Sequence, residues 1–248
     1  MGLVAPGRII GRGRELAAVD GFVSSVGAGA TTLVLEGEAG VGKSTLWRAG
    51  VRTAAEGGVR VLETRPAQAE ARFAFAGLGD LLGGPLEGLL AALPVPQADA
   101  LRVALLLEPS RGSPPGERVI AAGVLGALRA LSVEAPTLIA IDDAQWLDSP
   151  SALVLGYAWR RLRDERVGWL VTRRTGEPMP APLADLDGSG RLRVEPFDLV
   201  AMHQLLEERL GVRLSRPLLR RVHEVAAGNA FFAVELGRAL QRLSLIHI

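Results

Sequence analysis

The chain has 248 residues, 48% of them hydrophobic, so it is long and apolar enough to bury one substantial core. Its 27 acidic and 28 basic residues nearly balance, so net charge gives no argument for a nucleic acid, an anionic membrane or a polyacidic partner. The absence of cysteine excludes disulfides and thiolate chemistry, and neither a membrane-length apolar run nor a signal-peptide pattern is found, so we expect a soluble, cytoplasmic protein with no membrane partner.

Short β-branched, apolar segments alternate with stretches of helical composition along most of the chain. The predicted strands are Thr31–Glu36, Val59–Glu63, Thr137–Ile141, Gly168–Thr172 and Arg191–Glu195. Strands that alternate with helices form parallel sheets covered on both faces. The sequence therefore predicts an α/β fold, with a parallel five-stranded sheet sandwiched by helices.

The long stretch between the second and third strands has no strand pattern, and it predicts inserted helices over Phe73–Leu93 and Ala98–Leu107. Proline and glycine mark two flexible loops, Pro109–Gly116 and Thr175–Gly190. After residue 196 the pattern is helical throughout. We expect helices at Leu199–Leu210, Arg216–Ala227 and Ala230–Leu243. The predicted division is a main domain at 1–196 and a small helical lid at 197–242.

The final segment, LSLIHI at 243–248, breaks the helical pattern. One reading frame of a common sequencing-adapter sequence would encode the same residues. We therefore expect a cloning or assembly scar here, and a natural protein that continues further.

A glycine-rich segment, GEAGVGKST, lies between the first predicted strand and a predicted helix and matches G-x-x-x-x-G-K-[ST]. In this phosphate-binding loop (P-loop), glycines let backbone N–H groups face the phosphates, Lys43 reaches the β- and γ-phosphates and the Ser44 hydroxyl ligates Mg²⁺. Lys43 is also the only lysine among the 28 basic residues. The alternative is a glycine-rich helix-capping turn. The predicted nucleotide-binding residues are Gly37, Glu38, Ala39, Gly40, Val41, Gly42, Lys43, Ser44 and Thr45.

A second motif, TLIAIDDAQWLD, places two adjacent carboxylates at the end of the third predicted strand. Ligands bind at the carboxyl edge of an open parallel sheet. Asp142 is predicted to hold Mg²⁺, and Asp143 to polarise the attacking water as a general base. The alternative is an acidic helix cap or turn. Asp148 is expected to cap the next helix, which Pro150 would open.

Three residues end the fourth predicted strand near the same sheet edge: Thr172, Arg173 and Arg174. A cation there could sense the γ-phosphate, and Arg173 is the predicted catalytic sensor. Solvated arginines are an equally good account of the pattern.

These motifs together resemble the signal-transduction (STAND) branch of AAA-like ATPases, particularly the ATPase module of large LuxR-type transcriptional regulators. IIGRGREL at Ile9–Leu16 is similar to the family's N-terminal box, which implies that Gly11 and Arg12 lie near the nucleotide. FAFAGLGDLL at Phe73–Leu82 also resembles the family. GNAFFAVEL at Gly228–Leu236 resembles the lid box, with Ala230 in place of a proline that contacts the adenine side in related proteins.

The resemblance implies a P-loop NTPase fold and a switch module that binds ATP or ADP with Mg²⁺ and hydrolyses ATP slowly. It also implies sensor and helix-turn-helix domains C-terminal to this chain, and homo-oligomerisation is a further possibility. The alternatives are a module that binds nucleotide without turnover and a P-loop phosphotransferase, for which no acceptor pocket is evident. We expect no direct DNA binding, because the arginines of Arg216–Arg221 fit the solvated face of a helix.

Overall fold

The computed structural model describes residues 9–84, 86–110, 112–184, 186, 190–211 and 213–242. They form a five-stranded sheet in the order β2-β3-β4-β1-β5, in which every neighbouring pair is parallel. The strands are β1 (Thr31–Gly37), β2 (Arg60–Thr64), β3 (Thr137–Ile141), β4 (Val167–Arg174) and β5 (Gly190–Arg193). The predicted sheet is confirmed: β3 has the predicted bounds, and the ends of the other strands lie within two residues of the prediction. The expected scar at 243–248 lies outside the described residues.

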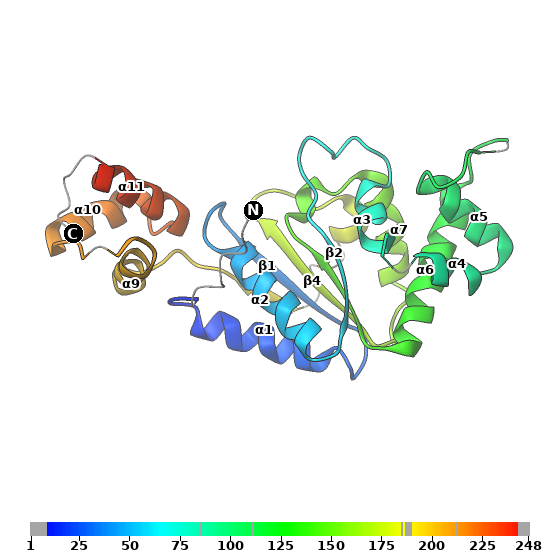
Figure 1. Ribbon diagram of the computed structural model, residues 1–248, viewed down its shortest axis with the longest axis horizontal. Coiled ribbons are helices and arrows are strands. Elements are labelled where there is room, and N and C mark those ends of the chain that lie inside the picture. The colour runs from blue at the N-terminus through cyan, green and yellow to red at the C-terminus, as the bar shows by residue number, and fades with distance from the viewer. Residues whose placement is uncertain are drawn as a thin grey trace.

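Helices cover both faces of the sheet because its strands are apolar on both sides. In β3, Leu138 and Ala140 face one core cluster, whereas Ile139 and Ile141 face the other. The first cluster lies under α1 (Gly13–Ser25) and α2 (Lys43–Glu56), which lie side by side in Figure 1. The helices with residues in the other cluster are α3 (Ala76–Leu82), α4 (Leu86–Ala91), α5 (Val95–Ala104), α6 (Glu117–Glu134), α7 (Ser149–Trp159) and α8 (Ala181–Ala184).

The inserted helices differ in detail from the prediction. The segment expected to be helical over Phe73–Leu93 is divided into α3 and α4, and Gly83 and Gly84 separate them. Glycine disfavours a helix interior, so the helix ends there. Helix α5 begins at Val95, earlier than expected, because the proline that follows is well suited to a first helical turn. The loop expected at Thr175–Gly190 contains the short helix α8.

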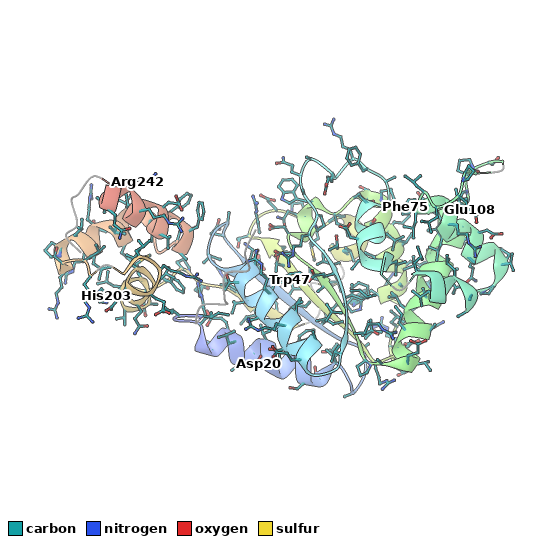
Figure 2. All side chains as sticks on the ribbon, in the orientation of Figure 1. Asp20, Trp47, Phe75, Glu108, His203 and Arg242 are labelled. Atoms are coloured by element: carbon teal, nitrogen blue, oxygen red, sulfur yellow. The ribbon has the colours of Figure 1, made fainter. Side chains whose placement is uncertain are left out.

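Three C-terminal helices form a separate group at one end of the molecule (Figure 1). They are α9 (Leu199–Leu210), α10 (Arg216–Ala226) and α11 (Ala230–Arg242), and they enclose a third core cluster that includes Met202, Leu206 and Val222. In Figure 2, His203 and Arg242 mark this end, and Glu108 marks the opposite end, where the inserted helices lie. The domain boundary after residue 196 stays a prediction.

The strand order decides which side chains meet at the carboxyl edge. Strand β4 lies between β1 and β3, so the residues at its end face both the P-loop and the acidic pair. Among the described helices, none is long and apolar enough to cross a membrane.

Candidate functional site

The P-loop connects the end of β1 to the first residue of α2. Two of its glycines have left-handed backbones, Gly40 with φ +77° and Gly42 with φ +111°. Residues with a Cβ adopt these angles only at a cost, so the glycines let the chain turn tightly before the helix begins. The turn leaves the N-terminus of α2, with its free N–H groups and positive partial charge, at the mouth of the loop. This is the local geometry of an anion site.

Lys43 is 5% exposed, and its Nζ donates hydrogen bonds to the carbonyl oxygens of Gly37 and Glu38, both at 2.9 Å. Its ammonium group thus lies across the loop that precedes it. Burial is the largest influence and lowers the pKa of Lys43, the carboxylate of Asp143 opposes this shift, and Arg174 adds to it. An anion in the loop would compensate the desolvated charge.

The predicted magnesium ligands lie together at the sheet edge. Ser44 Oγ donates to Asp142 Oδ1 at 3.0 Å, and Thr172 Oγ1 donates to the same oxygen at 2.7 Å. Thr172 Oγ1 in turn accepts the N–H of Asp143 at 2.7 Å. These hydroxyl and carboxylate oxygens are hard donors of the kind that Mg²⁺ takes, so the residues fit the expected ion.

Thr172 is the residue of this group for which the sequence pattern predicts no role. A threonine inside a β-branched strand is ordinarily explained by strand propensity. The signal that could have found it is its place at the carboxyl end of a strand that neighbours β3, and this depends on the strand order.

Asp143 has a left-handed backbone, with φ +57° and ψ +53°, which aspartate tolerates better than most residues. Its Oδ1 accepts a hydrogen bond from Gln145 Nε2 at 2.8 Å and lies 3.7 Å from Arg174 Nε. The side chain is 32% exposed and lines a pocket between the P-loop and the lid. It is therefore placed beside the ligand space, as a general base requires.

The two arginines that end β4 differ from the expectation. Arg173 Nη2 pairs with Glu36 Oε2 at 3.0 Å, its side chain is 12% exposed, and it is not among the residues that line the pocket. Arg174 lines the pocket instead. Successive side chains of a strand point to opposite faces, so two adjacent arginines could not both face the ligand.

The N-terminal box lies at the junction of the loop and the lid. Arg12 is 5% exposed; its Nη2 donates to the Val41 carbonyl at 2.8 Å and its guanidinium stacks 4.2 Å from the centre of the Phe197 ring. Gly11 has φ +64°, and a Cβ at this position would lie 2.6 Å from the Cβ of Ala201. Arg12 thus joins the P-loop to the start of the lid, and Gly11 packs against the first helix of the lid.

The lid also contacts the P-loop directly. Asn229 Nδ2 donates to the Ala39 carbonyl at 2.6 Å, and the N–H of Phe231 donates to the Gly40 carbonyl at 3.1 Å. A Cβ on Gly40 would lie 2.7 Å from Asn229 Oδ1. Glycine is therefore needed here for close approach of the lid as well as for the turn.

Two adjoining hollows lie between the P-loop and the lid. The larger has a volume of about 410 Å³ and the smaller about 70 Å³. The larger contains the charged groups Lys43, Asp143 and Arg174, whereas the smaller is bordered by Ile9, Ile10 and Arg12. The residues that line both are Gly42, Thr45, Leu205, Arg209 and Ala230. A ligand with a charged part and a flat apolar part would suit this pair of hollows.

Comparison with known proteins agrees with this geometry. Residues 8–171 match the sequence profile of the family described as AAA ATPase domain. No curated protein sequence matches the chain.

Solved structures show the same fold at low sequence identity. Cdc6p from Pyrobaculum aerophilum superposes with a TM-score of 0.63 at 14% identity, over 98% of this chain and 65% of that chain. Drosophila ORC bound to DNA gives 0.59 at 16% identity, over 98% and 59%. AMPPCP-bound DnaA from Aquifex aeolicus gives 0.52 at 14% identity, over 94% and 62%. This chain thus spans less than two thirds of each. Since the family profile covers more than half of the chain, the protein belongs to the AAA ATPase domain family and has its nucleotide-binding P-loop fold.

Proposed function

We propose that this chain is an ATP-binding, slowly hydrolysing switch module of a signal-responsive transcriptional regulator. The AAA ATPase family supports NTP hydrolysis in general. The regulatory role is supported by the resemblance of the P-loop, the acidic motif, the N-terminal box and the lid box to those of large LuxR-type regulators. The sensor and helix-turn-helix domains of such a regulator would be encoded C-terminal to this chain.

The observation that carries the proposal is the direct contact between the lid and the P-loop. Asn229 and Phe231 bind the carbonyls of Ala39 and Gly40, in the segment that would surround the phosphates. A change in the loop on binding or losing a phosphate would thus alter the docking of the lid without any intermediate element. A switch needs such a difference in contacts between its ligand states.

The proposed chemistry assigns each group a role. The loop amides and Lys43 bind the phosphates of ATP or ADP. Ser44 and Asp142 would hold Mg²⁺, which would supply positive charge beside the phosphates. Thr172 fixes the orientation of the Asp142 carboxylate. Asp143 accepts a proton from the attacking water.

For the sensor of the γ-phosphate, we propose Arg174 in place of Arg173, because Arg174 lines the pocket whereas Arg173 pairs with Glu36. The proposed base-binding region is the smaller hollow. Ala230 borders it where related lids have a proline, so its apolar contact with adenine is reduced.

Calorimetric titration of Mg-ATP and Mg-ADP into the chain and into Lys43→Ala tests the central claim. We expect binding by the wild type, loss of at least tenfold in affinity in the variant, and tighter binding of ADP than of ATP. Binding without any turnover would favour the module that only binds nucleotide. If a folded wild-type chain bound neither nucleotide, the proposal would be wrong.

A further inference from the structure

Gln145 makes hydrogen bonds through both polar atoms of its side-chain amide, at the carboxyl edge of the sheet. It lies in the 3₁₀ turn η1 (Ala144–Trp146) that follows the acidic pair. Its Nε2 donates to Asp143 Oδ1 at 2.8 Å, and its Oε1 accepts the backbone N–H of Arg174 at 3.4 Å. The first contact needs a donor and the second an acceptor, so the orientation of the amide is determined by its neighbours. Gln145 thereby connects the turn after β3 to the end of β4.

Asp143 is restrained by these contacts on one side only. Its N–H is held by Thr172, and its Oδ1 is held by Gln145 and faces the guanidinium of Arg174. In the described part of the chain, the side-chain hydrogen bond and the ion pair given for the Asp143 carboxylate both involve Oδ1, not Oδ2. The partly exposed carboxylate thus has one fixed oxygen and one that can accept a bond from water.

We infer that Gln145 is a positioning residue for ATP hydrolysis, an inference that rests on the proposed function. By holding Oδ1, it turns Oδ2 of Asp143 toward the water. Asp143 takes a proton from this water while the water oxygen bonds to the γ-phosphorus. The bond between the γ-phosphorus and the β–γ bridging oxygen breaks, and its electron pair leaves with ADP. Gln145 itself exchanges no proton and does not contact the nucleotide.

A purely structural role for Gln145 makes a different prediction. If the side chain mattered only for packing, Gln145→Glu, which has nearly the same shape, would preserve turnover. If the N–H donor matters, Gln145→Glu fails, because an ionised carboxylate cannot donate to Asp143 and repels it. Gln145→Ala removes both the shape and the donor. The pair of variants therefore separates the two roles.

The experiment measures kcat, KM and the affinity for ADP in wild type, Gln145→Ala, Gln145→Glu and the control Gln68→Ala, which changes an exposed glutamine on a loop. A second measurement records how tightly each protein traps ADP with aluminium fluoride, relative to ADP alone. The second measurement reports the geometry of the hydrolytic site even where turnover is too slow to detect.

Misplacing a catalytic group by about 1 Å costs on the order of 100-fold in rate, so we expect kcat to fall roughly 10- to 100-fold in both Gln145 variants. The affinity for ADP should stay within about twofold of wild type, and trapping with aluminium fluoride should weaken in parallel with kcat. Gln68→Ala should match wild type.

Three outcomes would overturn the inference. One is wild-type kcat and trapping in Gln145→Ala, and another is wild-type behaviour in Gln145→Glu. The third is a wild type that binds ADP but neither hydrolyses ATP nor traps ADP with aluminium fluoride, since there would then be no hydrolytic geometry to hold. The proposed function fails differently, through absence of nucleotide binding by the wild type itself.

Discussion

The contact between Asn229 and the P-loop gives a prediction about nucleotide release. Asn229 has two functions: its Nδ2 donates to the Ala39 carbonyl, and its Oδ1 accepts the N–H groups of Phe231 and Phe232 at the start of α11. Serine is as good a helix cap as asparagine, but its side chain is too short to donate to Ala39. Asn229→Ser should therefore remove the contact with the loop and keep the cap.

The size of the effect follows from the type of bond lost. A neutral hydrogen bond contributes about 0.5 to 1.5 kcal/mol net, and about 1.4 kcal/mol corresponds to a tenfold change in rate or affinity. If the lid must leave the loop before nucleotide escapes, ADP should dissociate about 2- to 12-fold faster from Asn229→Ser. Asn229→Ala should release ADP at least as fast and should also lose about 1 kcal/mol of lid stability, because the cap is removed.

Stopped-flow displacement of a fluorescent ADP analogue measures the release rate, and urea unfolding measures stability. Gln241→Ala is a matched control, because Gln241 Nε2 donates to the Leu210 carbonyl at 3.0 Å, a side-chain to backbone bond inside the lid. The control should not accelerate release. Release from Asn229→Ser at the wild-type rate, or equal acceleration in Gln241→Ala, would refute the proposed coupling.

Three further predictions concern stability and the sheet edge. Burial lowers the pKa of Lys43 in the folded protein below its ordinary value of 10.5, so between the folded and unfolded pKa values the unfolded chain binds more protons and the free energy of unfolding rises with pH. In urea unfolding from pH 7 to 10, Lys43→Met should lack this rise, and a pH-independent difference from wild type would contradict the prediction. Thr172→Val should lower the free energy of unfolding by about 1 to 3 kcal/mol, because the partly buried N–H of Asp143 loses its acceptor. Thr172→Ser should restore the wild-type value in the same assay. Asp148→Ala should lower the free energy of unfolding by about 3 kcal/mol or more and speed proteolysis of α3, because the Asp148 carboxylate accepts the N–H groups of Phe75, Gly77 and Ser151. Unchanged proteolysis would be evidence that Asp148 does not hold α3 in place.

Much of the fold could be predicted from local patterns. Four of the five strands are short runs with β-branched residues, the exception being β5, and the P-loop motif marks the end of β1 and the start of α2 by itself. The helix cap at Asp148 was also predictable and is confirmed, since its side chain accepts the N–H of Ser151. These features depend on residues near one another in the chain.

The rest of the candidate site depends on contacts between distant residues. That β4 separates β1 from β3 is a tertiary fact, and it gives Thr172 its contact with Asp142 and places Arg174 on the pocket. The bond from Asn229 to Ala39 joins residues at opposite ends of the sequence. Periodicity carries no information about such pairs. Patterns of individual segments therefore locate the motifs but not the side chains that connect them.

The burial of the only lysine has a consequence for chemical labelling. Apart from the α-amino group, Lys43 Nζ is the one primary amine of the chain, and it lies within the proposed nucleotide pocket. Amine-directed cross-linkers would thus report almost nothing about the outer surface, whose cations are arginines. An acylating reagent followed by mass spectrometry would instead read pocket occupancy at a single residue, because bound nucleotide would shield the amine.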